Sequence, residues 1–142
     1  MIAATPRQTY RALTREIRRW WDAEHSYTGK AENFSLDARA GGCFCEKLEN
    51  GGSVEHMHVV FASPGKMLRM TGGLGPLQQL PVQGVMIFSL SPADSGHTML
   101  HYSYAVSGYT EQGLSDLAGP VDRVQLGQLM RLKRFLETGK AE

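Results

Sequence analysis

The sequence predicts an α+β domain in which a curved antiparallel β-sheet wraps around a long C-terminal α-helix. Three observations predict this class: a helical pattern near the N-terminus, a central run of short alternating segments separated by turn sequences, and an amphipathic stretch near the C-terminus. The length of 142 residues suits one domain, and the chain contains no repeat or long linker. We therefore expect residues 1–142 to form a single domain.

The first expected element is a helix over residues 6–21. Thr5 and Gln8 have the spacing of a capping box, and Pro6 suits the first helical position. The apolar side chains recur at helical spacing on one face, at Tyr10, Leu13, Ile17 and Trp20. Of the Trp20–Trp21 pair, we expect one ring in the core and the other beside a groove.

Six strands are expected next, because alternating apolar and polar residues are separated by glycine-rich and proline-containing turns. The expected strands are residues 34–38, 43–49, 54–61, 66–71, 82–90 and 98–106. Residues 50–53 and 91–96 read as hairpin turns. Residues 72–76 read as a glycine-rich connection near the mouth of a cavity, without the Lys-Ser/Thr of a phosphate loop.

The last expected element is a helix over residues 111–137, kinked or restarted at Pro120. Its apolar stripe contains two amides, Gln125 and Gln128. A buried amide without a partner costs roughly 1–3 kcal/mol, so these side chains either face a ligand or water network or cap strand-edge groups. Leu126 and Met130 lie on the opposite side, where they are available to a partner protein or a homodimer.

Charge and composition exclude several classes of protein. Fifteen Lys and Arg against fourteen Asp and Glu give a net charge of +1, so we expect no nucleic-acid partner. No apolar run reaches the roughly 18 residues of a membrane span.

Cys43 and Cys45 are expected as thiols, because a bridge between strand positions i and i+2 would strain the backbone. No signal peptide is visible, so the chain as numbered is expected in the cytoplasm, or in the periplasm if a signal segment precedes residue 1.

Several short motifs, taken in order, resemble one superfamily. They are residues 4–13, Trp20–Trp21, Gly41–Gly42, Asn50–Gly51–Gly52, residues 59–64 and Gly96–His97–Thr98. The chain resembles the START-like, or SRPBCC, superfamily, whose helix-grip fold wraps a sheet around a C-terminal helix. Within it, the chain is most similar to the activator of heat-shock-protein-ninety ATPase-like and polyketide cyclase/dehydrase-like groups. Members usually have a strand before the first helix, of which only residues 1–3 remain here.

The resemblance implies a cavity between sheet and helix that binds a small apolar or amphipathic molecule, without a cofactor. Two alternatives follow from it: a cyclase- or dehydrase-like enzyme, and a protein-interaction module that assists a chaperone ATPase. We expect aromatic, sulfur-containing and amide side chains to line the cavity, namely Trp21, Tyr27, Phe44, Met57, Met86, Phe88, Tyr102, Tyr104, Gln125 and Gln128. His25 and Tyr27 lie in the loop after the Trp pair, which should cross the cavity mouth.

Glu46 is the preferred catalytic candidate, with His25 second. Glu46 shares a strand face with Phe44 and should lie opposite Met57. A carboxyl group buried there would have a raised pKa, which suits a general acid or base. The alternative is a carboxylate paired with an arginine or placed at the sheet rim.

The same hairpin offers sulfur and nitrogen ligands. With a two-residue turn, four side chains share one strand face: Cys43, Cys45, His56 and His58. That set could bind zinc, but its spacing is not usual for a zinc site, so we expect no metal there. A three-residue loop would instead place the cysteines opposite Glu55 and Met57.

Overall fold

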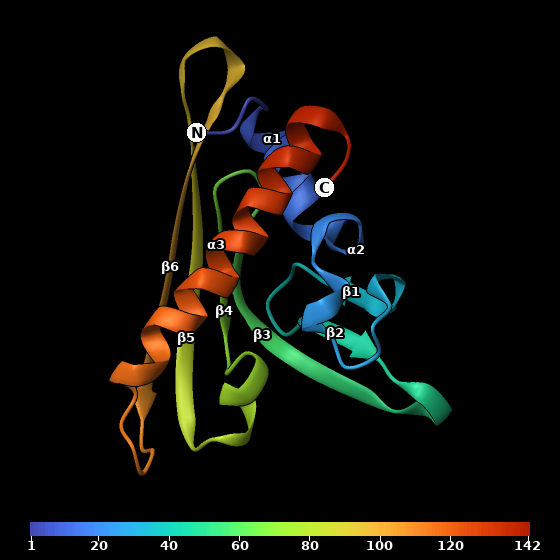
Figure 1. The fold of residues 1–142 in the computed structure, drawn as a ribbon. Helices are drawn as coiled ribbons and strands as arrows, with labels where there is room; N and C mark the ends of the chain where they lie inside the picture. The colour runs from blue at the N-terminus through green and yellow to red at the C-terminus, as the bar shows by residue number, and fades with distance from the viewer.

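The computed structural model describes residues 1–142 and confirms the α+β class (Figure 1). Six antiparallel strands form one curved sheet in the order β1-β2-β3-β4-β5-β6, so each strand pairs with its neighbour in sequence. The strands are β1 Phe34–Leu36, β2 Cys43–Lys47, β3 Ser53–Ser63, β4 Met67–Thr71, β5 Val82–Pro92 and β6 Thr98–Gly108. The long helix α3, Ser115–Thr138, crosses one face of this sheet and contains Pro120. The layout is that of a helix held by a sheet, as the sequence predicts.

The N-terminal helix is broken into two pieces, so the prediction of one continuous helix is wrong. The predicted capping box of Thr5 is present at the start of α1, Pro6–Thr14, and α2 covers Ile17–Trp20. Between them, Glu16 forms ion pairs of 3.2 Å with arginines on either side of the break. The break lets the indole nitrogen of Trp20 donate to the carbonyl of Ala12 at 2.8 Å, which fixes α2 against α1.

The short segment before α1 retains one pair of a strand. Ile2 is buried and exchanges two backbone hydrogen bonds with Thr98 on β6, at 2.8 and 2.9 Å. The N-terminal segment also meets the end of α3, because the backbone N–H of Ala3 donates to the carboxylate of Glu137 at 2.9 Å. The two ends of the chain therefore lie close together (Figure 1).

Strand β3 is bent by two β-bulges. His56 is the extra residue opposite the Phe44/Cys45 step of β2, and Val60 is the extra residue opposite β4. A bulge bends its strand and increases the local twist. The result is the strong curvature of β3, which carries β1 and β2 away from the plane of β5 and β6 (Figure 1).

The first hairpin closes with a three-residue loop, Glu49–Gly51, and not with a two-residue turn. Asn50 has a φ of 57°, in the left-handed region that asparagine tolerates better than most residues. The sequence is compatible with a two-residue turn or a three-residue loop. The observed three-residue loop places Cys45 opposite Glu55, as expected for that loop length. The bulge at His56 then shifts Cys43 to a position opposite His58.

The core lies between the concave face of the sheet and the helices. Trp20 and Trp21, expected as core and groove residues, are 1% and 7% exposed. Phe44, Met57, Met86 and Phe88 are 1–3% exposed and belong to this same cluster, together with Leu132 of α3. None of the helices combines the length and hydropathy that a membrane-spanning segment requires.

Candidate functional site

A pocket of about 400 Å³ lies where three separate stretches of chain meet: the loop after α2, the loop between β4 and β5, and α3. Its walls are largely apolar. They include Trp21, Leu74, Leu77, Val121 and Val124. The sequence-predicted residues that line it are Trp21, His25, Tyr27 and Gln125, together with His56, which had been assigned elsewhere.

The loop after α2 lines this pocket through His25, Ser26 and Tyr27. The hydroxyl of Tyr27 donates to Oε1 of Gln78 at 3.0 Å, and Nε2 of Gln78 donates to the carbonyl of Glu55 at 2.6 Å. These bonds join the loop, the short η4 helix Gly75–Gln79 and β3. Because half of Tyr27 remains exposed, this joint between Tyr27 and Gln78 lies at the surface.

The carboxylate of Glu46 also binds the loop after α2. Its side chain is fully buried, and its carboxylate accepts backbone N–H groups of Tyr27 at 3.2 Å and Thr28 at 2.8 Å. A third donor, Nε2 of His56, lies 2.8 Å from Oε1. The structure contains no arginine bound to Glu46, and the residue is not at the sheet rim.

The predicted raised pKa of Glu46 is wrong. Burial by itself would raise the pKa of this carboxyl group, but the hydrogen bonds from Thr28, Tyr27 and His56 outweigh burial and hold the pKa below its ordinary value. Glu46 is therefore a carboxylate at neutral pH. It positions groups around it, and its lone pairs face protein donors.

His56 lines the pocket, and only one of its ring nitrogens has a partner in the protein. Glu46 is ionised and can only accept, so the proton of a neutral His56 sits on Nε2 and Nδ1 is left as an acceptor. Nδ1 has no hydrogen-bond partner in the protein, although His56 is only 7% exposed and lines the pocket. The ring of Tyr27 stacks at 5.8 Å between centroids, with planes 30° apart. The pair Glu46–His56 thus places an oriented imidazole at the wall of an apolar pocket.

The β-bulge explains why the sequence placed His56 on the wrong face. Regular alternation puts His56 beside His58 on the outer face, whereas the extra residue turns His56 inward next to Met57. A signal was present: Val54 and the pair Met57 and Val59 are inward-facing apolar residues of opposite parity, which one regular strand cannot provide.

Gln125 is a buried polar residue on the α3 side of the pocket. Its Oε1 accepts from the hydroxyl of Tyr102 at 2.9 Å, and its Nε2 has no partner in the protein. Burial, reinforced by nearby Tyr104 and Asp122, raises the pKa of Tyr102, so this phenol remains a neutral donor. The hydroxyl of Tyr104 donates to the carbonyl of Gly72 at 2.8 Å, and burial raises its pKa as well. Tyr104 lines an adjoining hollow of about 270 Å³.

Gln128 does not line the pocket. Its Oε1 accepts a hydrogen bond from the backbone N–H of Asp22 at 3.0 Å. This bond joins α3 to the start of the loop after α2. Nε2 of Gln128 is buried without a partner. Leu126 and Met130, on the other side of α3, are 62% and 41% exposed, as predicted.

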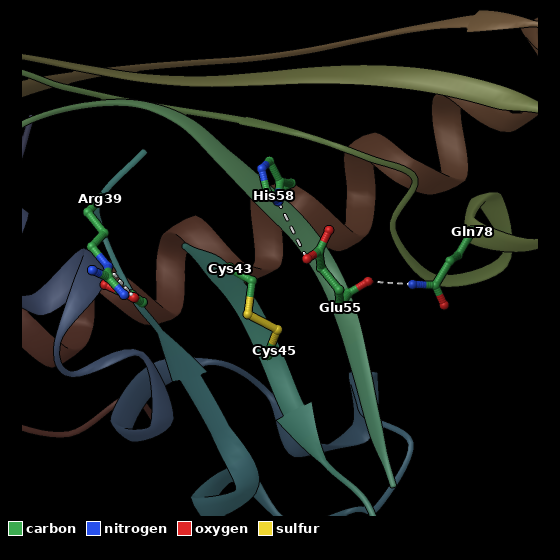
Figure 2. Close-up of a disulfide and its surroundings, with 7 residues drawn as sticks. Arg39, Cys43, Cys45, Glu55, His58 and Gln78 are labelled. Atoms are coloured by element: carbon green, nitrogen blue, oxygen red, sulfur yellow. Dashed lines mark hydrogen bonds and ion pairs between the residues drawn. A yellow bond between two sulfur atoms is a disulfide. The ribbon is translucent and has the colours of Figure 1, made fainter. Parts of the chain in front are cut away.

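The cysteine prediction is corrected. Cys43 and Cys45 form a disulfide and not two thiols (Figure 2). Their Cα atoms are 5.5 Å apart, within the usual range for a disulfide. The expected set of Cys43, Cys45, His56 and His58 on one face does not occur, because His56 points inward.

A second hollow, of about 640 Å³, lies beside α1 and is lined by Arg7, Arg11 and Arg15. These arginines are exposed, and Arg11 is already paired with Glu16. The smaller pocket is lined by His56, the partner of the buried Glu46, so we take that pocket as the candidate site.

Similar structures are found among proteins of rhizobia. One from Mesorhizobium loti has a TM-score of 0.65 and 22% identity over 96% of this chain and 92% of its own. One from Rhizobium leguminosarum has a TM-score of 0.60 and 22% identity over 96% and 89%. One from Rhizobium loti has a TM-score of 0.60 and 19% identity over 89% and 87%. No family model matches the chain, and no curated protein is significantly similar to it. At these identities, the likeness to the three solved structures establishes the fold.

Proposed function

We propose that this protein binds a small, largely apolar molecule that carries one hydrogen-bonding polar group. The observation that carries the proposal is the unpartnered Nδ1 of His56, oriented by buried Glu46 at the wall of an apolar pocket. A polar group that donates a hydrogen bond would satisfy this nitrogen. The free Nε2 of Gln125 would meet an acceptor on the same molecule.

The size of the pocket supports a small molecule. A volume of about 400 Å³ falls in the range of roughly 300–1,000 Å³ that is typical of small-molecule sites. Apolar walls with a few fixed polar groups are the usual composition of such sites. The resemblance to SRPBCC proteins leads to the same proposal, with the cavity between sheet and C-terminal helix.

The test is a titration with Nile red, a neutral dye whose fluorescence rises in apolar surroundings. Val124→Phe fills the pocket, and we expect it to weaken dye binding at least tenfold. Leu126→Phe lies on the exposed side of the same helix and is the matched control, expected to bind like the wild type. Equal binding by Val124→Phe and the wild type would refute the proposal. Native mass spectrometry of the purified protein then identifies any retained molecule.

A second function, favoured by the Glu46–His56 pair, is proton transfer to or from the bound molecule, as in a cyclase- or dehydrase-like enzyme. A carboxylate that fixes the tautomer of a histidine is the usual way to orient a general base. His56 would accept the proton, and Glu46 would act as a positioning residue. His25, which lies exposed at the pocket, is too weakly held to share this orientation.

The probe for proton transfer is 4-nitrophenol, whose phenolate absorbs at longer wavelength than the phenol. At a pH below the midpoint of the free probe, we expect the wild-type protein to increase the phenolate band. His56→Gln should abolish the increase while Nile red binding persists. A phenolate band that survives in His56→Gln would remove His56 as the base.

A further inference from the structure

Three metal-ligating side chains, those of Cys43, Cys45 and Glu55, gather on the outer face of the first hairpin, and His58 lies beside Glu55. Cys43 lies opposite His58, and Cys45 lies opposite Glu55. Both sulfur atoms and a carboxylate oxygen of Glu55 lie within 4.8 Å of one another, and Nδ1 of His58 is 3.5 Å from Oε2 of Glu55 (Figure 2). Between the cysteines, Phe44 points the other way, into the core.

The disulfide is accessible to an external reductant. Both cysteines are half-buried, and the side chains of His58 and Glu55 beside them are 44% and 52% exposed. The bridge joins residues two apart, so it closes a very small loop and constrains the unfolded chain little. The fold is therefore expected to persist when this bond is reduced.

We propose that Cys43 and Cys45 form a redox-gated site for a thiophilic divalent cation of the Zn²⁺ type. A dithiol reductant gives the disulfide two electrons and two protons, which breaks the S–S bond, yields two thiols and converts the reductant to its own disulfide. The cation then displaces one proton from each thiol and is held by two thiolates.

Glu55 and His58 complete the site. Zinc is bound by Cys sulfur, His nitrogen and carboxylate oxygen, most often by four ligands in a tetrahedron. Cys43, Cys45, Glu55 and His58 supply that number and these donor types from two paired strands. A disulfide oxidant such as oxidised glutathione then takes two electrons from the two thiolates and two protons from water and leaves as two thiols, which re-forms the Cys43–Cys45 bond. Both anionic sulfur ligands are lost in this step, so the cation is released.

The experiment uses the whole protein with Co²⁺ as the probe. The protein is reduced with dithiothreitol, which is then removed without oxygen, and Co²⁺ is added. We expect one equivalent to bind with thiolate-to-cobalt charge-transfer bands, and Zn²⁺ to displace it. The oxidised protein should show no such bands.

Cys43→Ser/Cys45→Ser should abolish the charge-transfer bands, and Glu55→Gln or His58→Gln should weaken Co²⁺ binding about tenfold or more. His101→Gln, an exposed histidine on β6, is the matched control and should change nothing.

Three results would overturn the proposal: no thiolate bands in the reduced protein, bands that persist without the cysteines, or binding unaffected by both Glu55→Gln and His58→Gln. Circular dichroism checks that each variant folds. If the double serine variant does not fold, alkylating the reduced wild type with iodoacetamide replaces it, and the bands must then disappear. Failure of dithiothreitol to expose two alkylatable thiols in the native protein would also refute the accessibility on which the proposal depends.

Discussion

Glu46 shows how one residue can organise a site without touching a ligand. Its carboxylate receives three donors, two from the backbone of the loop after α2 and one from His56, and its side chain has no exposed surface. A buried carboxylate without those donors would be costly and would take up a proton. With these three donors the Glu46 carboxylate stays ionised. The same carboxylate therefore fixes both the position of the loop after α2 and the tautomer of His56.

Because the pKa of Glu46 is lowered in the folded protein, ionisation of this carboxyl group stabilises the fold, and acid removes that stabilisation. A folded-state pKa below the ordinary value of 4.5 means that the stabilisation is complete above pH 4.5 and is lost as the pH falls through the folded-state pKa. Glu46→Gln should therefore unfold about 1–3 kcal/mol more easily than the wild type at pH 7, with this difference shrinking in acid. Urea denaturation at pH 7 and at lower pH measures it.

The control for this prediction is Glu32→Gln, since Glu32 is exposed and has no ion pair. It should leave the free energy of unfolding unchanged at both pH values. A deficit of Glu46→Gln that is the same in acid as at neutral pH would contradict the ionised state assigned to Glu46.

At the scale of elements, the bulge in β3 decides which side chains face the pocket. Residues on either side of His56 keep regular alternation, with Val54 and Met57 both inward, and His56 is the inserted residue between them. Bulges are known to re-aim a side chain at a functional site, and this one brings His56 to Glu46.

The bulge predicts unequal effects for two single-residue deletions in β3. Deletion of His56 should restore plain alternation, so the sheet should survive with a loss of roughly 1–3 kcal/mol in the free energy of unfolding. Deletion of His58 should turn Val59 to the outer face, and we expect a loss of more than about 4 kcal/mol or failure to fold. Urea denaturation followed by circular dichroism compares them. Equal losses would show that His56 is not the inserted residue.

Most elements of this fold could be predicted from the sequence, because turn residues and periodicity are local signals. The six strands, the β2–β3 and β5–β6 hairpins and α3 lie close to their expected positions. The partners of Glu46 could not be predicted, because they depend on a loop length and a bulge that change strand register. The disulfide was not predicted either, because regular strand geometry argues against a bond between residues two apart. The opposite parity of Val54 and Met57 was the one local sign of the bulge.

At the scale of the molecule, α3 holds the domain together from end to end. Its C-terminal half packs Leu132 and Phe135 into the core, while Gln125 bonds to Tyr102 of β6 and Gln128 to Asp22 in the loop after α2. Near its end, Lys133 donates to the carbonyl of Met1 at 2.7 Å, which fastens the N-terminal segment. One helix thus supports the core, the pocket and the pairing of the chain ends.

This role of α3 predicts a large difference between two leucines on the same helix. Leu132 is 0% exposed, so Leu132→Ala should lower the free energy of unfolding by about 2–5 kcal/mol. Leu126 is 62% exposed, and Leu126→Ala should stay within about 0.5 kcal/mol of the wild type. Chemical denaturation of the two variants gives the comparison, and similar losses would be inconsistent with a helix that buries only one side.

The order of the strands has a consequence for how this protein is made. Every strand pairs with the one before it, so each hairpin can close as soon as both its arms have left the ribosome. The pocket is different, because its final wall, including Val121, Val124 and Gln125, is translated after all the strands. Until then the apolar hollow of the sheet is open to whatever surrounds the nascent chain. A molecule present at that stage would be enclosed when the last helix arrives, without having to pass the Tyr27–Gln78 joint.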